Sequence, residues 1–506
     1  MYTLISLLFF LPFITAEGVS SAQNATNFAL LYGYPLLAFQ NFADQFLEFN
    51  ATNYLINTQE LSSPSSKTVS DVQLTIPELP SWEFALFSFY DIYGDNYANI
   101  GTGNIDKPGR YLVQRRQDGT FDFGAQSQGG SQYVAKVTSP TSYGILLIRW
   151  GVNSSSINMV HRFQAETSLI SVNSTGNGSV APSLPSLGTS AIFASKSMTP
   201  VEKALQLLAR YERWNQLETE AGAQKVSRLL LLAGISNGTY SRPSGVDLNV
   251  ANNSVLQAAT AAAAASANNE ALNNGWVMTR AGGLAGNFNN GTAFAYRTAI
   301  ASGGFLQLSN PNAVYPSWVN SSTGGNGLAG GGEVTLGPND AILYTFSGKP
   351  ALEPTGFWSL TAYMGNYLIP NSLERYAIGN RNAIAYPDGT PVYGSNATHA
   401  DGEFQILVQP ADVSPPTNWS SNWLPGPSGG GNISVTLRLY GAGPGLLSGQ
   451  YQYPVVTKQA ALTNGTAATS GGGNSTSTSP IYTGLASKEN IASLSVIGQI
   501  LVSLEK

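Results

Sequence analysis

Residues 341–363 read AILYTFSGKPALEPTGFWSLTAY and contain two runs rich in β-forming residues, 341–346 and 357–363. The glycines and prolines between them are the residues that turn a chain between paired strands. Further runs of the same kind follow at 405–408 and 433–440. This pattern predicts a β-rich C-terminal domain over residues 276–457.

The same pattern recurs earlier in the chain. Short runs rich in Val, Ile, Leu, Phe and Tyr occur between residues 71 and 150, with Gly and Pro at hairpin-like intervals. Apolar residues are also dense between residues 28 and 47, where they suggest helices. These features predict an N-terminal β-rich domain over residues 23–165.

The periodicity changes between the two domains. After Thr199 and Pro200, apolar residues recur at helical spacing up to Trp214, and further helices are expected over 221–232 and 255–272. Residues 166–275 are therefore predicted to be a linker and helical connector, and residues 458–506 a low-complexity tail. The expected fold class is α+β and β-rich: two antiparallel β domains, the second a jelly-roll-like sandwich, joined by a helical connector.

Composition narrows the possible functions. Lys plus Arg number 24 against 29 Asp plus Glu, for a net charge of −5, and only 10% of the 506 residues are charged. So few cations argue against nucleic-acid binding. The chain has no cysteine and two histidines, which leaves no disulfide, zinc–thiolate site or cysteine nucleophile. We therefore expect neither a metal nor a cofactor.

The N-terminus indicates secretion. Residues 2–15 form an uncharged, mainly apolar run that is too short to span a membrane, and small residues follow it. This predicts a signal peptide over residues 1–22, cleaved near Ala16 or Ala22, with no transmembrane span in the mature chain. Fourteen Asn-x-Ser/Thr sites support a secreted, extracellular glycoprotein; they are Asn24, Asn50, Asn153, Asn173, Asn177, Asn237, Asn252, Asn290, Asn320, Asn396, Asn418, Asn432, Asn464 and Asn474.

Two blocks of sequence resemble known families. The first contains LYGYP at 31–35, LTIP at 74–77 and NYANIG at 96–101. The second contains GFWSLTAY at 356–363, ERYAIG at 374–379 and LRLY at 437–440. Together they resemble the paired domain-of-unknown-function families 1254 (N-terminal) and 1214 (C-terminal), whose members are described as exported or cell-envelope proteins. The resemblance implies two β-rich domains and no settled activity.

One departure from these families affects a potential site. Members usually carry an Asn-x-Asp-Thr-Leu-Tyr segment just before the strand that corresponds to residues 74–76, and a histidine upstream of it. Here residues 61–70 read LSSPSSKTVS, and Thr58 stands near the place of the histidine. If those groups serve a site in the families, this chain lacks part of it.

No complete catalytic motif is present. Gly-x-Ser-x-Gly occurs around Ser236 and Ser428, but Ser236 follows a predicted helix and Ser428 lies in a Pro/Gly-rich loop, whereas a nucleophile elbow needs a strand before the serine and a helix after it. His399, a potential base for such a serine, lies beside a glycosylation site. Asp91 and Asp95 are calcium-type ligands without the spacing of a calcium loop, so a turn is expected there.

Aromatic, amide and guanidinium side chains gather in the second block. Aromatic rings and Asn or Arg groups suit the rings, hydroxyls and carboxylates of a ligand, with Arg375 as the best anion anchor. The opposing interpretation is that the aromatic residues fill the core and that Arg375 makes structural bonds. The candidate ligand-binding residues are Trp358, Tyr363, Asn366, Asn371, Arg375, Tyr376, Asn422, Trp423 and Arg438.

Two functions remain open at this stage. The first is a secreted, N-glycosylated binding or structural protein of the cell surface or extracellular space, with a possible small-molecule or glycan ligand and possible self-association. The alternative is an extracellular hydrolase or lyase that acts on a small aromatic, ester or sugar substrate in a β-sandwich pocket.

Overall fold

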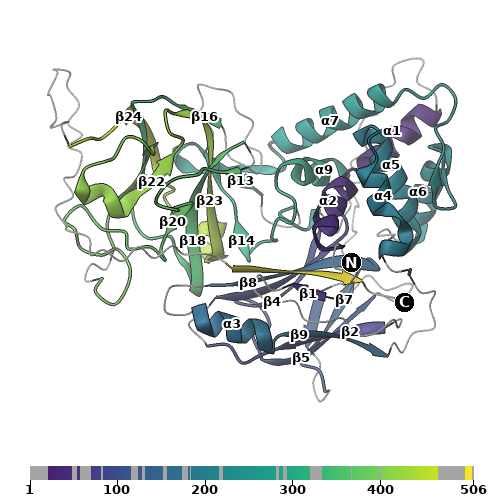
Figure 1. Ribbon diagram of the computed structural model, residues 1–506, viewed down its shortest axis with the longest axis horizontal. Helices are drawn as coiled ribbons and strands as arrows, with labels where there is room; N and C mark the ends of the chain where they lie inside the picture. The colour runs from purple at the N-terminus through teal and green to yellow at the C-terminus, as the bar shows by residue number, and fades with distance from the viewer. Residues whose placement is uncertain are drawn as a thin grey trace, which may run out of the picture.

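The computed structural model describes most of the chain as three packed parts: an N-terminal β-sandwich, a helical layer and a C-terminal β-sandwich (Figure 1). The described residues are 21–47, 54–56, 70–80, 84–115, 124–127, 132–151, 157–173, 181–182, 184–215, 220–280, 284–288, 293–318, 333–365, 367–397, 401–464 and 496–503.

The N-terminal sandwich consists of two five-stranded sheets. One has the order β1 (Tyr54–Ile56), β25 (Val496–Ser503), β8 (Tyr143–Trp150), β3 (Ala85–Asp91), β4 (Asn96–Gly101). The other has the order β6 (Gly124–Ser127), β7 (Ala135–Ser139), β5 (Gly109–Arg115), β2 (Ser70–Ile76), β9 (Ser168–Asn173). The core between them includes Leu74, Phe87 and Tyr111, and α3 (Ile157–Glu166) adds Val160 and Phe163 to it.

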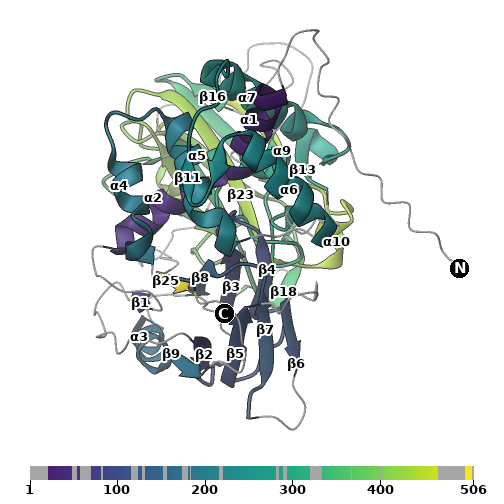
Figure 2. The same cartoon turned by 90° about the vertical axis from the view of Figure 1, so that its right-hand side faces the viewer.

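Strand β3 is buried on both faces, which explains its nearly continuous apolar sequence. Phe87 and Phe89 point into the sandwich core, while Leu86 and Tyr90 point into a second core shared with the helices. The N-terminal domain is therefore covered on one side by the helical layer, as Figure 2 shows from a second direction.

Helices from the start and the middle of the chain form this layer together (Figure 1). Helix α5 begins with a capping box, in which the Glu202 amide donates to Thr199 Oγ1 at 3.2 Å and the Thr199 amide donates to Glu202 Oε2 at 2.8 Å. The longer helices are α1 (Ser21–Gly33), α2 (Pro35–Leu47), α5 (Pro200–Tyr211), α6 (Glu220–Leu232), α7 (Leu248–Ala264) and α9 (Phe294–Gly303), with the shorter α4 (Thr189–Ala194) beside them.

The C-terminal sandwich also packs two sheets around one core, which includes Trp358, Phe346 and Phe404. One sheet has the order β14 (Ala313–Val314), β23 (Gly431–Ala442), β18 (Leu352–Met364), β19 (Tyr367–Leu368), with β16 (Glu333–Leu336) on β23 and β20 (Ala377–Gly379) on β18. The other has the order β22 (Trp423–Gly426), β21 (Phe404–Pro410), β17 (Asp340–Phe346), β24 (Val455–Ala460). Small elements complete the fold: β10 (Ile235–Ser236), β11 (Thr239–Tyr240), β12 (Asn269–Ala271), β13 (Trp276–Thr279), β15 (Ser317–Trp318) and α10 (Pro444–Leu447).

The predicted fold class, a β-rich α+β protein, is confirmed. Some local expectations differ from the structure. Part of the expected linker forms β9 and α4, helix α7 ends at Ala264 and is followed by β12, and the tail contributes β25 to the N-terminal sheet. Two strand pairs, β5–β7 and β21–β22, are parallel. No helix in the described part of the chain has the length and apolar character needed to cross a bilayer.

Candidate functional site

The candidate residues of the second block take several different places in the C-terminal sandwich. Trp358 points into the core, where its ring lies 4.9 Å from the Phe346 ring and its Nε1 donates to Tyr393 Oη at 2.9 Å. The residues next to Trp358 along β18 point to the opposite face of the sheet, because side chains alternate along a strand. There Tyr363 Oη accepts a hydrogen bond of 2.8 Å from Arg438 Nη2. Trp358 and Arg438 therefore belong to different faces of one sheet.

Arg375 and Asn371 hold a loop together. Arg375 Nη1 donates to the carbonyl oxygens of Ser420 at 2.6 Å and Trp423 at 2.8 Å. Asn371 closes the turn before it, since its Oδ1 accepts from the Leu373 and Arg375 amides and its Nδ2 donates to the Arg375 carbonyl. These contacts give Arg375 Nη1 and both polar atoms of the Asn371 side chain backbone partners.

The remaining candidates also have separate settings. Asn422 is buried, and its Nδ2 donates to the carbonyls of Ala385 at 2.9 Å and Gln405 at 2.7 Å. Trp423 packs in a small core on the other sheet, and Tyr376 is exposed. Asn366 and His399 lie outside the described residues. The structure does not bring this set to one place, and its ligand-binding role stays a prediction.

A cavity of about 520 Å³ lies elsewhere, where the N-terminal sandwich meets the chain between the two domains. Its volume falls within the range of roughly 300–1,000 Å³ that is typical of small-molecule sites. No described side chain in its lining is charged, and asparagines predominate. The lining residues are Asn96, Tyr97, Ala98, Asn99, Asn104, Ile105, Ala125, Ala285, Asn287, Ser309, Asn310, Pro311 and Asn312.

Asn96 on β4 joins the two walls of this cavity. Its Oδ1 accepts hydrogen bonds from the Ser309 amide at 3.0 Å, Ser309 Oγ at 2.7 Å and Asn99 Nδ2 at 2.7 Å. Its backbone amide donates to the Gly286 carbonyl at 2.7 Å. Gly286 has φ +69°, and a Cβ there would lie 2.5 Å from the Leu308 carbonyl carbon, so a side chain would prevent this close approach.

Two further asparagines differ in how their amides are satisfied. Asn104 Nδ2 donates to Asn312 Oδ1 at 2.6 Å across the cavity wall. In contrast, Asn310 Nδ2 is buried and has no hydrogen-bond partner among the described residues. Buried donors are nearly always satisfied in native proteins. The Asn310 amide is therefore a donor available to a group inside the cavity.

Buried charges lie next to the cavity, one residue from Asn96. The Asp95 carboxylate lies 3.6 Å from Arg297 Nη1, and the Asp91 carboxylate accepts from the Tyr93 and Asp95 amides at 2.8 and 3.0 Å. Burial raises the pKa of Asp91 to about 6, and burial together with the neighbouring Asp91 raises the pKa of Asp95. Neither aspartate lines the cavity, so this cluster acts on the site by fixing the turn before β4.

The cavity can therefore offer amide donors, amide oxygens and a hydroxyl to a ligand, with Ile105, Pro311 and the Tyr97 ring as apolar surface. Such a mixture suits a neutral molecule with several hydroxyl groups. In the described part of the chain, no cluster of three or more His, Asp or Glu side chains could hold a metal ion.

The sequence does not predict this site. NYANIG at 96–101 carries the family resemblance, and Asn310-Pro-Asn312 has the composition of an ordinary turn. The available signal was the density of asparagine in these two short segments. Only the fold shows that they are opposite each other.

Family models match both domains. The model described as "Protein of unknown function (DUF1254)" matches residues 68–171, and the one described as "Protein of unknown function (DUF1214)" matches residues 332–444. The two matches follow each other in this order along the chain. Asn96, Asn99 and Asn104 lie within the residues that the DUF1254 model matches, whereas Ser309 to Asn312 lie between the two matched regions.

Known structures add information on the fold. The crystal structure of the VPA0106 protein from Vibrio parahaemolyticus has a TM-score of 0.53 and 14% sequence identity to this chain. The similarity covers 87% of this chain and 99% of that one, and at such low identity it shows a shared fold alone. No curated protein matches the chain.

Proposed function

We propose that this protein is a secreted, N-glycosylated binding protein of the cell surface or extracellular space, and that its asparagine-lined cavity takes a neutral, hydroxyl-rich small molecule such as a saccharide. The observation that carries the proposal is an uncharged cavity of about 520 Å³ in which the buried Asn310 amide lacks a partner. A hydroxyl oxygen of the ligand would satisfy that amide.

Binding is favoured over catalysis by the groups that reach the cavity. Its described lining contains neither a carboxylate nor an imidazole to transfer a proton. Of the two nearest buried aspartates, Asp91 accepts from backbone amides through Oδ1 and Asp95 lies beside Arg297, and neither lines the cavity. These side chains position the cavity wall, and the asparagines recognise the ligand.

The surface is compatible with the glycosylation part of the proposal. Asn237, Asn396, Asn432 and Asn464 are exposed, as an attached glycan requires. Residues 1–20 lie outside the described residues, and α1 begins at Ser21. Signal cleavage near Ala16 would leave this helix whole, whereas cleavage after Ala22 would remove its first residues.

A thermal-shift titration tests the proposal. The secreted protein is titrated with glucose, mannose, galactose and N-acetylglucosamine, and with glucuronate as a charged comparison. A ligand that binds only the folded state raises Tm in a concentration-dependent way. We expect at least one neutral saccharide to do so, and Asn310→Leu to weaken its binding about three- to tenfold because one hydrogen bond is lost.

The matched control is Asn253→Leu, an exposed substitution on α7 away from the cavity. It should leave the saccharide response unchanged. The proposal fails if no neutral saccharide shifts Tm, or if Asn253→Leu and Asn310→Leu change the response equally. Glycan release followed by peptide mass spectrometry tests the glycosylation separately and should find Asn237 and Asn396 occupied.

A further inference from the structure

Two arginines from different domains lie near the same tyrosines where the sandwiches meet, at the contact between the Phe84 and Tyr440 rings. Arg149 lies on β8 of the N-terminal domain and Arg438 on β23 of the C-terminal domain. Both guanidinium groups interact electrostatically with the side chains of Tyr315 and Tyr440. We call Arg149, Arg438, Tyr90, Tyr315 and Tyr440 the arginine seam.

Neither guanidinium group of the seam has an acidic partner. Arg149 Nη1 donates to Ser88 Oγ at 3.2 Å, and Arg438 Nη2 donates to Tyr363 Oη at 2.8 Å. No carboxylate lies within ion-pair distance of either group in the described part of the chain. Arg297 shows the more usual arrangement of a buried arginine, because its fully buried side chain lies beside the Asp95 carboxylate. Two largely desolvated positive charges that have only neutral hydroxyls as partners are energetically unfavourable, and a bound anion would offset this cost.

The seam is partly open to solvent. Arg149, Arg438, Tyr315 and Tyr440 each keep part of their surface exposed to solvent. Tyr90, in contrast, is fully buried, and its hydroxyl lies beside the Arg149 and Ser88 side chains. It therefore helps to hold the Arg149 guanidinium group at the edge of the seam.

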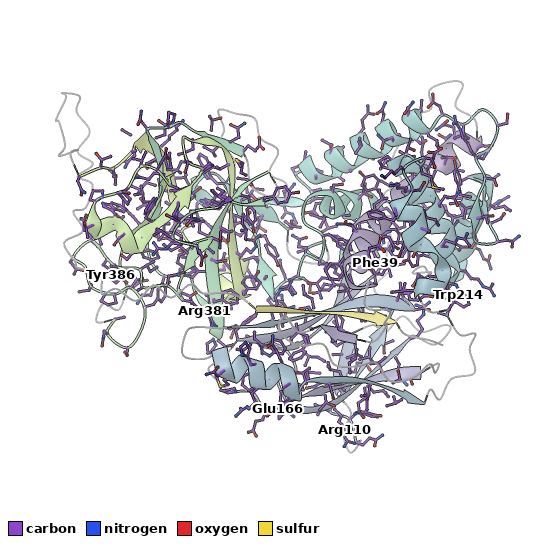
Figure 3. The ribbon with its side chains drawn as sticks, viewed as in Figure 1. Phe39, Arg110, Glu166, Trp214, Arg381 and Tyr386 are labelled. Carbon is purple, nitrogen blue, oxygen red and sulfur yellow. The ribbon has the colours of Figure 1, made fainter. Side chains whose placement is uncertain are left out.

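Aromatic rings border the seam. Phe357 and Tyr440 stack with their centroids 4.4 Å apart, and the edge of Phe84 meets Phe357 at 4.9 Å. Arg381, labelled in Figure 3 at the same junction, places its guanidinium carbon 5.1 Å from the Phe357 ring. It also approaches Gly151 closely, because a Cβ there would lie 2.3 Å from Arg381 Nη2. The rings of Phe84, Phe357 and Tyr440 therefore form an apolar border to the seam, against which an aromatic ligand can pack.

We propose that the arginine seam is an anion-binding site for a small aromatic carboxylate, with the carboxylate between Arg149 and Arg438 and the ring against Phe357 and Tyr440. A planar carboxylate matches the paired donors of a guanidinium group better than a tetrahedral anion does. This site is distinct from the asparagine-lined cavity and takes a ligand of opposite character.

Isothermal titration calorimetry tests the proposal with benzoate as the probe and benzamide as its neutral isostere. Benzoate should bind and benzamide should not. Arg149→Gln and Arg438→Gln should each weaken benzoate binding about tenfold or more, because each removes a charge-assisted hydrogen bond. Tyr90→Phe keeps the ring and removes only the hydroxyl, so it should weaken binding about three- to tenfold without endangering the fold. Arg110→Gln, at an exposed position, is the control that should change nothing.

Several results would overturn the proposal. They are equal binding of benzoate and benzamide, binding of inorganic phosphate or sulfate without benzoate, no binding of any anion, or equal benzoate affinity in the wild type and in both folded arginine variants. The saccharide titration distinguishes this site from the cavity, because Arg149→Gln and Arg438→Gln should leave a neutral saccharide response intact, whereas Asn310→Leu should leave benzoate binding intact.

Discussion

Asn96 and Ser309 are 213 positions apart, and Ser309 donates two hydrogen bonds to the same Asn96 oxygen, from its amide at 3.0 Å and from its Oγ at 2.7 Å. This contact attaches the segment between the two domains to strand β4. It also fixes the distance between the two asparagine-bearing walls of the cavity.

Asn96→Ala should therefore reduce the free energy of unfolding by about 2–4 kcal/mol, because it leaves several buried hydrogen-bonding groups without a partner at once. Besides Ser309, those partners include Asn99 and the Phe89 carbonyl, which accepts from Asn96 Nδ2 at 3.1 Å. Urea unfolding measures the change. Asn104→Ala, at an exposed position on the same cavity rim, should cost clearly less, and equal costs would contradict the role assigned to Asn96.

Asp91 makes stability depend on pH. Its folded pKa of about 6 exceeds the ordinary 3.8, so the folded state binds more protons than the unfolded state between these values. The stability contributed by this group is present at low pH and is lost as pH rises from about 4 to about 6, with a slope of at most about 1.4 kcal/mol per pH unit. Asp91→Asn keeps the oxygen that accepts from Tyr93 and Asp95, and it removes the buried charge and its effect on the pKa of Asp95.

The variant should therefore be at least as stable as the wild type at pH 7 and show a flatter profile between pH 4 and 6 in denaturant unfolding. A profile that stays as steep as that of the wild type would show that Asp91 does not cause the dependence.

Arg375 is expected to be structural. Arg375→Ala removes two hydrogen bonds that tie the turn at Asn371 to η4 (Thr417–Asn422) and β22, and it should cost about 1–3 kcal/mol. Differential scanning calorimetry with and without the saccharide that binds best separates stability from binding. A lower Tm with an unchanged ligand-induced shift is expected. Loss of that shift at unchanged stability would instead place the ligand in the second block.

Strand β25 completes the N-terminal sheet. It pairs with β8 along its full length, from Val496 opposite Trp150 to Ser503 opposite Tyr143. Deleting residues 496–506 would expose the backbone donors and acceptors of β8 as a new sheet edge. We expect lower thermal stability and concentration-dependent self-association by size-exclusion chromatography with light scattering. A monomeric deletion variant with unchanged Tm would show that β25 is dispensable.

The elements that the sequence predicts best are those whose pattern is local. The start of α5 is predicted by Thr199, Pro200 and Glu202. The apolar runs around Phe87 and Tyr344 indicate strands without any knowledge of the strands they pair with. Strand β25 was not predicted, because its apolar residues also fit a weak helical spacing and its partner β8 lies more than 340 positions earlier. Its secondary structure is decided by tertiary pairing, which no local window contains.

The residues of the predicted cluster lie apart for a related reason. Arg375, Asn371 and Asn422 are close in sequence to aromatic residues, which suggests a binding cluster, but in the fold they make hydrogen bonds to backbone carbonyls and amides in separate places. In the sequence, Asn96 and Asn310 resemble ordinary turn residues. The fold brings them to one cavity by placing the segment around Asn310 against β4. The same holds for Arg149 and Arg438, which come from separate sandwiches.

The most direct test of the proposed function is a crystal structure of the protein soaked with the neutral saccharide that gives the largest thermal shift. We predict electron density for the sugar in the asparagine-lined cavity, with a hydroxyl oxygen within hydrogen-bonding distance of Asn310 Nδ2. Density elsewhere, such as on the exposed Tyr367 of the β18–β19 hairpin, together with an empty cavity, would contradict this account.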